Sequence, residues 1–394
     1  MTDANEKLSD GEVGERLRIA REEAGKTQSA AADAAAVART TIVAIEKGQR
    51  RIRLEELQKL AVFYGTSANA ILRREAVQLD LVPRFRKLAQ DADPAVENAS
   101  RLLNDLVRAE VELEDALGIR RPRNYPPERP ILPGDVRLQA EQDAQELRDW
   151  LGLGPGSILD IVAVLDLQLG IRIYLRRLEG RISGLFAFDD RAGACMLLNA
   201  NHPVERLTHT ALHELAHFVS ARQKPEVLAD DAPGASREER YADTFARSFA
   251  MPGRPVCQRF AEITAGQTHL TRRHVILLAY TFGVSREAMV RRLEELKLAR
   301  SGTWDWFQSN GGINGEHVLQ VLGEAAERSA PSIEGRALVP HRLGLLAREA
   351  WKRSIYSEGQ LARLLRLDRH EMRQVLDGAE AEESEAHDFV KLSH

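Results

Sequence analysis

The chain has 394 residues, of which 43% are hydrophobic and 29% are charged, and its formal net charge is −4. Its length predicts two or three globular domains, and its charge balance excludes a protein that binds nucleic acid or a membrane with its whole surface. The two cysteines, Cys195 and Cys257, are too few for a disulfide framework or a cysteine-only zinc site, which indicates a reducing environment.

The first residues of the chain are polar and lack the apolar segment of a signal peptide. No stretch approaches the roughly 18 apolar residues that a membrane-spanning helix needs. We therefore expect no membrane anchor and a cytoplasmic location.

Residues 11–75 show a helical hydrophobic pattern broken by turn residues. Gly25, Gly48 and Gly65 stand where three of the helices would end. The helices expected are residues 14–24, 27–35, 39–47, 54–64 and 67–73. Five short helices in about 60 residues is the size of a helix-turn-helix domain.

The run from Lys26 to Gly48 resembles the XRE/Cro-repressor family without gaps. The resemblance implies a DNA-binding domain in which Gln28 lies near a phosphate and a recognition helix opens at Arg39. Residues 39–53 hold five basic side chains and one acidic one, a balance typical of phosphate binding. The expected DNA contacts are Gln28, Arg39, Thr40, Thr41, Lys47, Arg50 and Arg51. When bound to DNA the protein would be nucleoid-associated.

Four alanines depart from the XRE/Cro pattern. Ala31 and Ala35 stand where leucines usually fill the core. Ala36 stands where a turn glycine usually takes a positive φ, and Ala38 replaces the hydroxyl residue that caps the recognition helix. The missing cap and a left-handed alanine each cost about 1 kcal/mol. A helix-turn-helix used only for protein docking or dimerisation stays the alternative.

Residues 76–134 are expected to connect two domains. Apolar residues from Leu102 to Leu117 recur at spacings of three and four among many charges, which predicts a helical connector or dimer element. Residues 120–134 hold five of the 15 prolines and therefore predict a linker.

Beyond the linker, residues 137–151 and 158–169 predict two helices that lead into three strands. The strands are expected near residues 171–178, 184–188 and 194–198. We predict that they form a small antiparallel sheet.

The helix expected at Thr208–Val219 contains the sequence His213-Glu214-Leu215-Ala216-His217. Side chains four residues apart share one face of a helix, so His213 and His217 can direct an imidazole nitrogen to one point. Zinc binds neutral imidazoles at about 2.0–2.1 Å, and a carboxylate beside it serves as general base in this pattern. Glu214 would be that base.

Because a catalytic zinc usually holds three protein ligands, another donor is needed. A helix expected from Ser236 and ending at Pro252 carries Glu239 and Asp243 four residues apart on one face. Glu239 is the predicted third ligand, in preference to the neighbouring Glu238. Asp243 is placed to accept the second ring N–H of a liganding histidine. Two ordinary histidines on an amphipathic helix are the alternative to a zinc site.

The run from Ile171 to Pro252 resembles the ImmA/IrrE-type metallopeptidases. The resemblance is carried by the turn Ser183-Gly184, a strand ending Leu197-Leu198-Asn199, His-Glu-Leu-x-His, Glu239-Arg-Tyr-Ala242-Asp-Thr-Phe245-Ala246 and Met251-Pro252. It implies one zinc ion held by His213, His217 and Glu239, with Glu214 as the general base. It also implies a protease that acts on a few regulatory proteins, often a repressor.

Two features of such a site stay open. An exposed edge strand can hold an extended substrate, and the strand around Leu185–Phe188 or Met196–Leu198 is the candidate. The group that stabilises the developing negative charge on the substrate could be Tyr241, His209, Arg240 or His274.

The rest of the chain predicts further helices. Residues 256–265, 272–282 and 286–296 resemble the helices that follow Met-Pro in the same peptidase family, and residues 304–312 mark a junction. Residues 343–354 and 356–376 form a helix and a helix-turn-helix-like pair around Leu367-Asp368, for which protein contact is the expected use. The acidic run from Asp377 to Asp388 predicts a disordered tail.

Together these patterns predict a mainly α protein with a small antiparallel sheet, of the α+β class. The expected parts are an N-terminal five-helix domain (11–75), a helical connector and linker (76–134), a zincin-like minimal peptidase domain (135–300), a C-terminal helical region (301–378) and an acidic tail (379–394).

The function expected is that of a DNA-binding regulator with a zinc endopeptidase that cleaves a repressor or antitoxin-like protein in a stress response. The partners expected are DNA, that protein substrate and a second copy in a homodimer. The alternative is a non-proteolytic transcription factor whose peptidase-like domain serves as a sensor or interaction module.

Overall fold

This computed structural model describes residues 9–66, 68–72, 93–158, 160–178, 182–224, 226–229, 236–323 and 338–384. The chain divides into two compact units, one built mainly from the helices near its two ends and one from its middle. Each unit is described by itself. In the described part of the chain, no helix has the length and apolar character needed to cross a membrane.

The N-terminal region forms five helices, as predicted. They are α1 (Asp10–Glu23), α2 (Gln28–Ala35), α3 (Arg39–Glu46), α4 (Leu54–Tyr64) and α5 (Ala68–Leu72). Leu17, Ile42 and Leu60 lie in their shared core, where they are almost completely buried. The hydroxyl of Thr27 caps α2, and Gly65 ends α4 with φ 74°. The short helices therefore have the stop signals that their sequence indicates.

The helical part of the expected connector is α7 (Pro94–Leu117). The preceding part of the connector, residues 76–92, lies outside the described residues.

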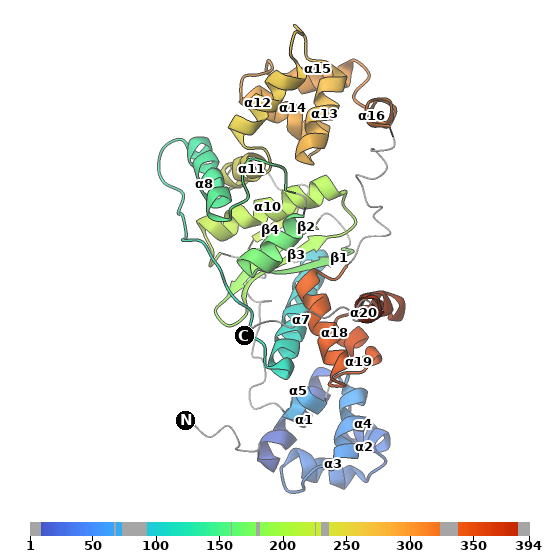
Figure 1. The fold of residues 1–394 in the computed structure, drawn as a ribbon. Helices are drawn as coiled ribbons and strands as arrows, with labels where there is room; N and C mark the ends of the chain where they lie inside the picture. The colour runs from blue at the N-terminus through green and yellow to red at the C-terminus, as the bar shows by residue number, and fades with distance from the viewer. Residues whose placement is uncertain are drawn as a thin grey trace, which may run out of the picture. The chain divides into compact units, whose positions relative to one another are not determined.

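The middle unit contains a sheet with α8 (Val136–Trp150) and two crossing helices, α10 (Val204–Ser220) and α11 (Arg237–Ala250) (Figure 1). The strands are β1 (Arg172–Arg176), β2 (Ile182–Asp189), β3 (Gly193–Asn199) and β4 (Glu226–Ala229). A short helix, α9 (Ile161–Ala163), runs into the π-helical turn η1 (Val164–Leu169) before β1.

The sheet is mixed, so the expectation of an antiparallel sheet is wrong in one respect. Its strand order is β1-β3-β2-β4, and β1 pairs with β3 in parallel. Successive strands reverse direction along the chain, and because β3 rather than β2 lies beside β1, these two neighbours run the same way. The fourth strand, β4, was not predicted. It pairs with β2, so that β2 and β3 are both interior strands and neither is the exposed edge that was expected to hold a substrate.

A buried cluster joins the sheet to α8, α10 and α11. Phe186, Leu215 and Phe245 are fully buried in it and come from β2, α10 and α11. At Gly184 the strand β2 passes very close to α10, because a Cβ there would lie 2.7 Å from Thr210 Cγ2 and 3.4 Å from Glu214 Oε1. This close contact therefore fixes the distance between α10 and the sheet, and with it the position of the side chains on α10.

The helices α12 (Gly253–Ile263), α13 (Arg272–Phe282) and α14 (Arg286–Glu295) follow α11 as predicted. Two further helices follow, α15 (Thr303–Ser309) and α16 (Gly315–Leu322). The first lies where a junction is expected, and the second lies in the region expected to be helical. The buried guanidinium of Arg292 ties α14 to α11 and α8, because it donates to the Met251 carbonyl and pairs with Glu141.

The C-terminal helices are α18 (His341–Lys352), α19 (Glu358–Leu364) and α20 (Arg369–Ser384). The expectation of a disordered tail from Asp377 is wrong for its first residues, because α20 continues to Ser384. Alanine and glutamate, which fill this stretch, are good helix formers. The rest of the expected tail, residues 385–394, lies outside the described residues.

Candidate metal centre

The helix α10 places two imidazoles one turn apart on its buried face. His213 and His217 are 2% and 4% exposed, and every residue from Thr210 to Ser220 is buried. A polar ring in such a place needs a partner, because burying it without one is costly.

The helix α11 brings a carboxylate to these rings. Ser236 caps α11 by accepting a hydrogen bond from the Glu239 backbone N–H, which sets Glu239 in the first helical turn. The Glu239 side chain is 30% exposed, so the point where it meets the two rings is open on one side.

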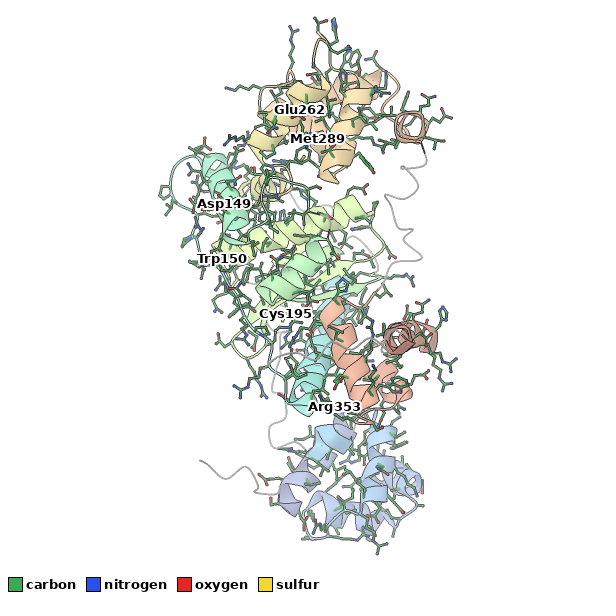
Figure 2. All side chains as sticks on the ribbon, viewed as in Figure 1. Asp149, Trp150, Cys195, Glu262, Met289 and Arg353 are labelled. Atoms are coloured by element: carbon green, nitrogen blue, oxygen red, sulfur yellow. The ribbon has the colours of Figure 1, made fainter. Side chains whose placement is uncertain are left out.

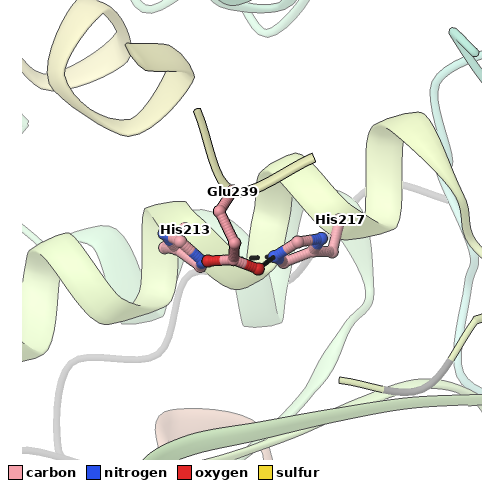
Figure 3. A group of neighbouring side chains, drawn as sticks. All are labelled: His213, His217 and Glu239. Atoms are coloured by element: carbon pink, nitrogen blue, oxygen red, sulfur yellow. Dashed lines mark hydrogen bonds and ion pairs between the residues drawn. The ribbon is translucent and has the colours of Figure 1, made fainter. Parts of the chain in front are cut away.

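Three ligand atoms converge between the two helices. His213 Nε2 lies 3.1 Å from His217 Nε2 and 3.2 Å from Glu239 Oε2, and His217 Nε2 lies 3.6 Å from Glu239 Oε1. Figure 3 shows the carboxylate of Glu239 between the two rings. Ligands about 2.0–2.1 Å from a tetrahedral zinc stand about 3.4 Å apart, so the three groups match the edge lengths of such a site. The structure therefore brings together the three residues expected to bind zinc.

Asp243 lies one turn after Glu239 and contacts the other nitrogen of the first ring. His213 Nδ1 donates to Asp243 Oδ1 at 3.1 Å. This bond fixes the tautomer in which the Nε2 lone pair of neutral His213 faces Glu239.

Electrostatics show that the point between the rings favours positive charge. Burial lowers the pKa of His213, but its hydrogen bonds to Asp243 and Glu239 outweigh that effect and raise the pKa to about 10. Burial and the charge of His213 lower the pKa of His217 to about 4. The hydrogen bond and charge of His213 hold the pKa of Glu239 below its ordinary value. One buried positive charge is thus stabilised where the three groups meet, and a divalent cation fits the same donors.

Glu214 is completely buried between α10 and β2. Its carboxylate packs against Gly184 of β2, where a Cβ would lie 3.4 Å from Glu214 Oε1. The expected general base therefore sits next to the two imidazoles but does not belong to the cluster of three ligand atoms.

Two adjoining cavities lie at His209, one helical turn before His213. Their volumes are about 740 Å³ and 240 Å³, and both are lined by His209, Arg247, Ser285 and Ala288. His209 precedes His213 by one turn, with ring centroids 6.3 Å apart, and burial lowers the pKa of His209 to about 4. Arg247 follows Asp243 by one turn and pairs with Glu295 at 3.0 Å. The contribution of α14 to these cavities had no sequence motif that could have predicted it.

The four groups considered for charge stabilisation differ in their surroundings. The buried Tyr241 hydroxyl donates to Asp143, and burial raises its pKa. His274 accepts from the Thr271 backbone N–H and so caps its own helix. Arg240 is exposed on α11, whereas His209 lines the cavities beside the centre.

The residues expected to contact DNA lie on and after α3. Arg39, Thr40, Lys47 and Arg51 are exposed, and Thr41 is half-buried. Arg50 pairs with Glu56 at 2.8 Å, which reduces its freedom to reach a phosphate.

Gln28 has a structural contact as well. Its amide donates to Glu46 Oε2 at 2.9 Å, and Glu46 also pairs with the buried Arg21 at 2.6 Å. This polar cluster ties α1, α2 and α3 together. Gln28 is therefore anchored at the start of α2 by a group within its own domain.

Comparisons with known proteins agree with the two regions. Residues 167–294 match the family model described as IrrE N-terminal-like domain, and residues 17–71 match the family model described as helix-turn-helix. A comparison with curated proteins gives no match. The crystal structure of ComR from Streptococcus suis is 12% identical, covers 96% of this chain and 97% of its own, and has a TM-score of 0.17, which is too low to carry an argument. The chain therefore joins an XRE-type helix-turn-helix domain to an ImmA/IrrE-type peptidase-family domain.

Proposed function

We propose that the protein is a DNA-binding regulator whose IrrE-like domain is a zinc-dependent endopeptidase. The observation that carries the proposal is the convergence of His213, His217 and Glu239, whose ligand atoms all lie within 4.8 Å of one another. Glu214 beside them supplies the base that hydrolysis requires. We propose as substrate a repressor or antitoxin-like protein, whose cleavage would switch genes on under stress.

In this proposal His213, His217 and Glu239 hold one zinc ion, which would activate water and polarise the scissile carbonyl. Glu214 accepts a proton from the attacking water and returns it to the leaving amine. Asp243 keeps His213 in the tautomer that presents Nε2. His209 and Arg240 remain as candidates for a hydrogen bond to the carbonyl oxygen, since Tyr241 and His274 have other partners, and of the two only His209 lines the cavities.

The substrate would lie in the cavities beside the ligands. Apolar side chains at Ala246, Ala250, Met251, Val284 and Ala288 line the smaller cavity. Such a wall fits an apolar substrate residue next to the scissile bond. The larger cavity is bounded by charged residues of α14, including Glu287 and Arg291. A segment of mixed character would therefore fit better than a uniformly apolar one.

The DNA-binding half of the proposal rests on the helix-turn-helix match and on the exposed face of α3. Arg39 and Thr40 stand at the N-terminus of α3, where a recognition helix contacts base edges. The exposed Lys47 and Arg51 follow in the chain, and we propose them as phosphate ligands.

The peptidase is tested with Glu214→Gln, which preserves the shape of the side chain and removes its basicity. We expect the purified wild-type and Glu214→Gln proteins to bind about one zinc each, and only the wild type to change the fragment pattern of a regulatory protein in cells. Glu238→Gln, an exposed neighbour of Glu239, is the matched control. Identical proteomes of cells that express the wild type and Glu214→Gln would refute the peptidase.

The DNA role is tested with Arg39→Ala and Thr41→Ala on the region upstream of the protein's own gene. Each variant should bind more weakly than the wild type, whereas Lys59→Ala on the exposed side of α4 should not. Retention of wild-type affinity by both variants, without dependence on salt, would contradict DNA reading by α3.

A further inference from the structure

The C-terminal helices α18, α19 and α20 repeat the geometry of α1, α2 and α3. Each helix of the second set begins about 330 residues after its counterpart in the first set. Thr27 caps α2 by accepting from the Ala30 backbone N–H, and Ser357 caps α19 by accepting from the Gln360 backbone N–H. The helices that follow open at Arg39 and at Arg369, so the spacing from cap to second helix is the same in both sets.

The turn between the paired helices is the same in both copies. Ala36 has φ 57° and Arg366 has φ 54°, and each is a left-handed residue in the turn that follows the first helix of its pair. The next backbone N–H closes the turn in both copies. Val37 donates to the Ala32 carbonyl at 3.0 Å, and Leu367 donates to the Ala362 carbonyl at 2.9 Å.

The buried positions also correspond. Four residues that fill the core between α2 and α3 have buried counterparts between α19 and α20. The pairs are Ala31 with Leu361, Ala32 with Ala362, Ala35 with Leu365 and Ile42 with Met372. The second copy carries larger apolar side chains at two of these positions. The structure therefore holds two helix-turn-helix units, although the family model for this motif covers only the first.

The outward face of the second unit carries four arginines. Besides Gly359 and Asp368, its exposed residues in α19, the turn and the first turns of α20 are Arg363, Arg366, Arg369, His370, Arg373 and Gln374. Their counterparts in the first unit are Asp33, Ala36, Arg39, Thr40, Val43 and Ala44. The four arginines of the second unit thus stand where the first unit has Asp33, Ala36, Arg39 and Val43.

Acidic groups lie in the same unit, but Glu358, Asp368 and Glu371 are held in pairs or caps, and the acidic part of α20 begins only at Asp377, about two turns after Arg369. Arg373 pairs with Glu358 at 3.1 Å, but the Arg373 side chain is 65% exposed, and an exposed pair of this kind is weak and easily exchanged. Glu371 is held by the backbone N–H of Asp368 at the N-terminus of α20, and Asp368 accepts from the Glu371 N–H. These two carboxylates cap the helix.

We propose that α19 and α20 form a second DNA-binding unit, in which α20 enters the major groove of duplex DNA. Arg369, His370 and Gln374 would face base edges, and Arg363, Arg366 and Arg373 would face phosphates. A protein-docking surface is the alternative expected for this motif. No large apolar side chain is exposed on the described parts of α19 and α20, whereas docking surfaces usually have an apolar centre.

The test uses the full-length protein and a mixed-sequence DNA duplex, with fluorescence anisotropy measured over a range of salt concentrations. The variant Arg369→Ala/Arg373→Ala is compared with Lys352→Ala/Arg353→Ala, which removes the same charge at the end of α18. Arg353, labelled in Figure 2, directly follows α18 and pairs with Glu349 of that helix. Loss of the Arg373 phosphate contact should lower the slope of log affinity against log salt by about 0.9, and loss of the Arg369 base contact should lower the affinity further, whereas the control should match the wild type.

Both variants are also made in an Arg39→Ala/Thr41→Ala background, so that failure of the second unit is distinguished from failure of the first. Residual DNA binding in that background should depend on Arg369 and Arg373. Arg369→Lys/Arg373→Lys, which keeps the charge, should restore the salt slope, and equal melting temperatures show that the variants are folded. An unchanged slope, or a changed oligomeric state in light scattering without any change in DNA binding, would overturn the proposal.

Discussion

Asp243 determines which nitrogen of His213 faces the candidate metal centre. Its carboxylate accepts from Nδ1 at 3.1 Å, and the side chain is only half-exposed. We predict that Asp243→Ala weakens zinc binding by about 10–100-fold without abolishing it, because the three ligands stay in place and only their orientation is loosened. Competition with a fluorescent chelator measures the affinity. The amide oxygen of Asp243→Asn can still accept from Nδ1, so the zinc affinity of this variant should lie between those of the wild type and Asp243→Ala. Equal zinc affinities for all three proteins would show that Asp243 has no orienting role.

Gly184 is the residue at which β2 comes closest to α10. A Cβ at this position would lie 2.7 Å from Thr210 Cγ2, on a buried β-branched side chain that has no room to move. We predict that Gly184→Ala destabilises the protein by about 1–3 kcal/mol, the usual cost of overpacking. Urea denaturation measures the change.

Thr210→Ala in the same chain removes the clashing methyl group and should recover part of that loss. Gly156→Ala is the matched control, because a Cβ there meets no atom within 4 Å. If Gly184→Ala were as stable as Gly156→Ala, β2 would have to pass α10 at a greater distance.

The close grouping of candidate ligands could be predicted because it depends on short-range rules. His213 and His217 share a face by helical periodicity, and the cap at Ser236 sets the position of Glu239 on the next helix. The cavities could not be predicted in this way. Arg247 and Ser285 line the same cavity because the contact of Arg292 with the Met251 carbonyl holds α14 at the end of α11. Such a long-range contact leaves no local pattern in the sequence.

At the scale of elements, the first helix-turn-helix carries two local defects that the sequence pattern indicated. Ala36 has φ 57° and ψ 45°, and the N-cap Ala38 makes no side-chain hydrogen bond to α3. We predict that Ala36→Gly stabilises the domain by about 0.5–1 kcal/mol, because glycine removes left-handed strain at some cost in unfolded-state entropy. Ala38→Ser should add about 1 kcal/mol by capping α3.

Thermal unfolding followed by circular dichroism measures both substitutions. The control is Ala24→Gly, since Ala24 ends α1 with φ −76° and has no strain to relieve. A gain in stability for Ala24→Gly as large as that for Ala36→Gly would contradict the explanation from backbone strain.

The order of the strands was less predictable than their existence. The apolar runs at β1, β2 and β3 are recognisable in the sequence. Which strand lies beside which in the sheet depends instead on how the whole domain packs. The strand β4 is only four residues long and begins at Glu226, so it lacks the alternating pattern that identifies longer strands. Its pairing with β2 made the predicted edge an interior position.

On the scale of the whole molecule, the candidate metal centre and the two helix-turn-helix units belong to different compact units. The unfolding of such a chain is not expected to be a single two-state transition. Ligands that bind one unit should therefore shift the melting of that unit alone.

Removal of zinc should lower the melting temperature of the middle unit alone. The three ligand groups come from α10 and α11, so a bound cation joins two helices of the middle unit and favours its folded state. Free zinc at 100 times its dissociation constant should stabilise that unit by about 2.7 kcal/mol. Differential scanning calorimetry of the zinc-loaded protein should then show one transition that moves to lower temperature when a chelator is added, while another stays fixed. His213→Ala should melt at the same temperatures with and without the chelator, because it lacks a ligand. If the chelator shifted every transition equally, or shifted His213→Ala as much as the wild type, the cation would have to be bound outside this cluster.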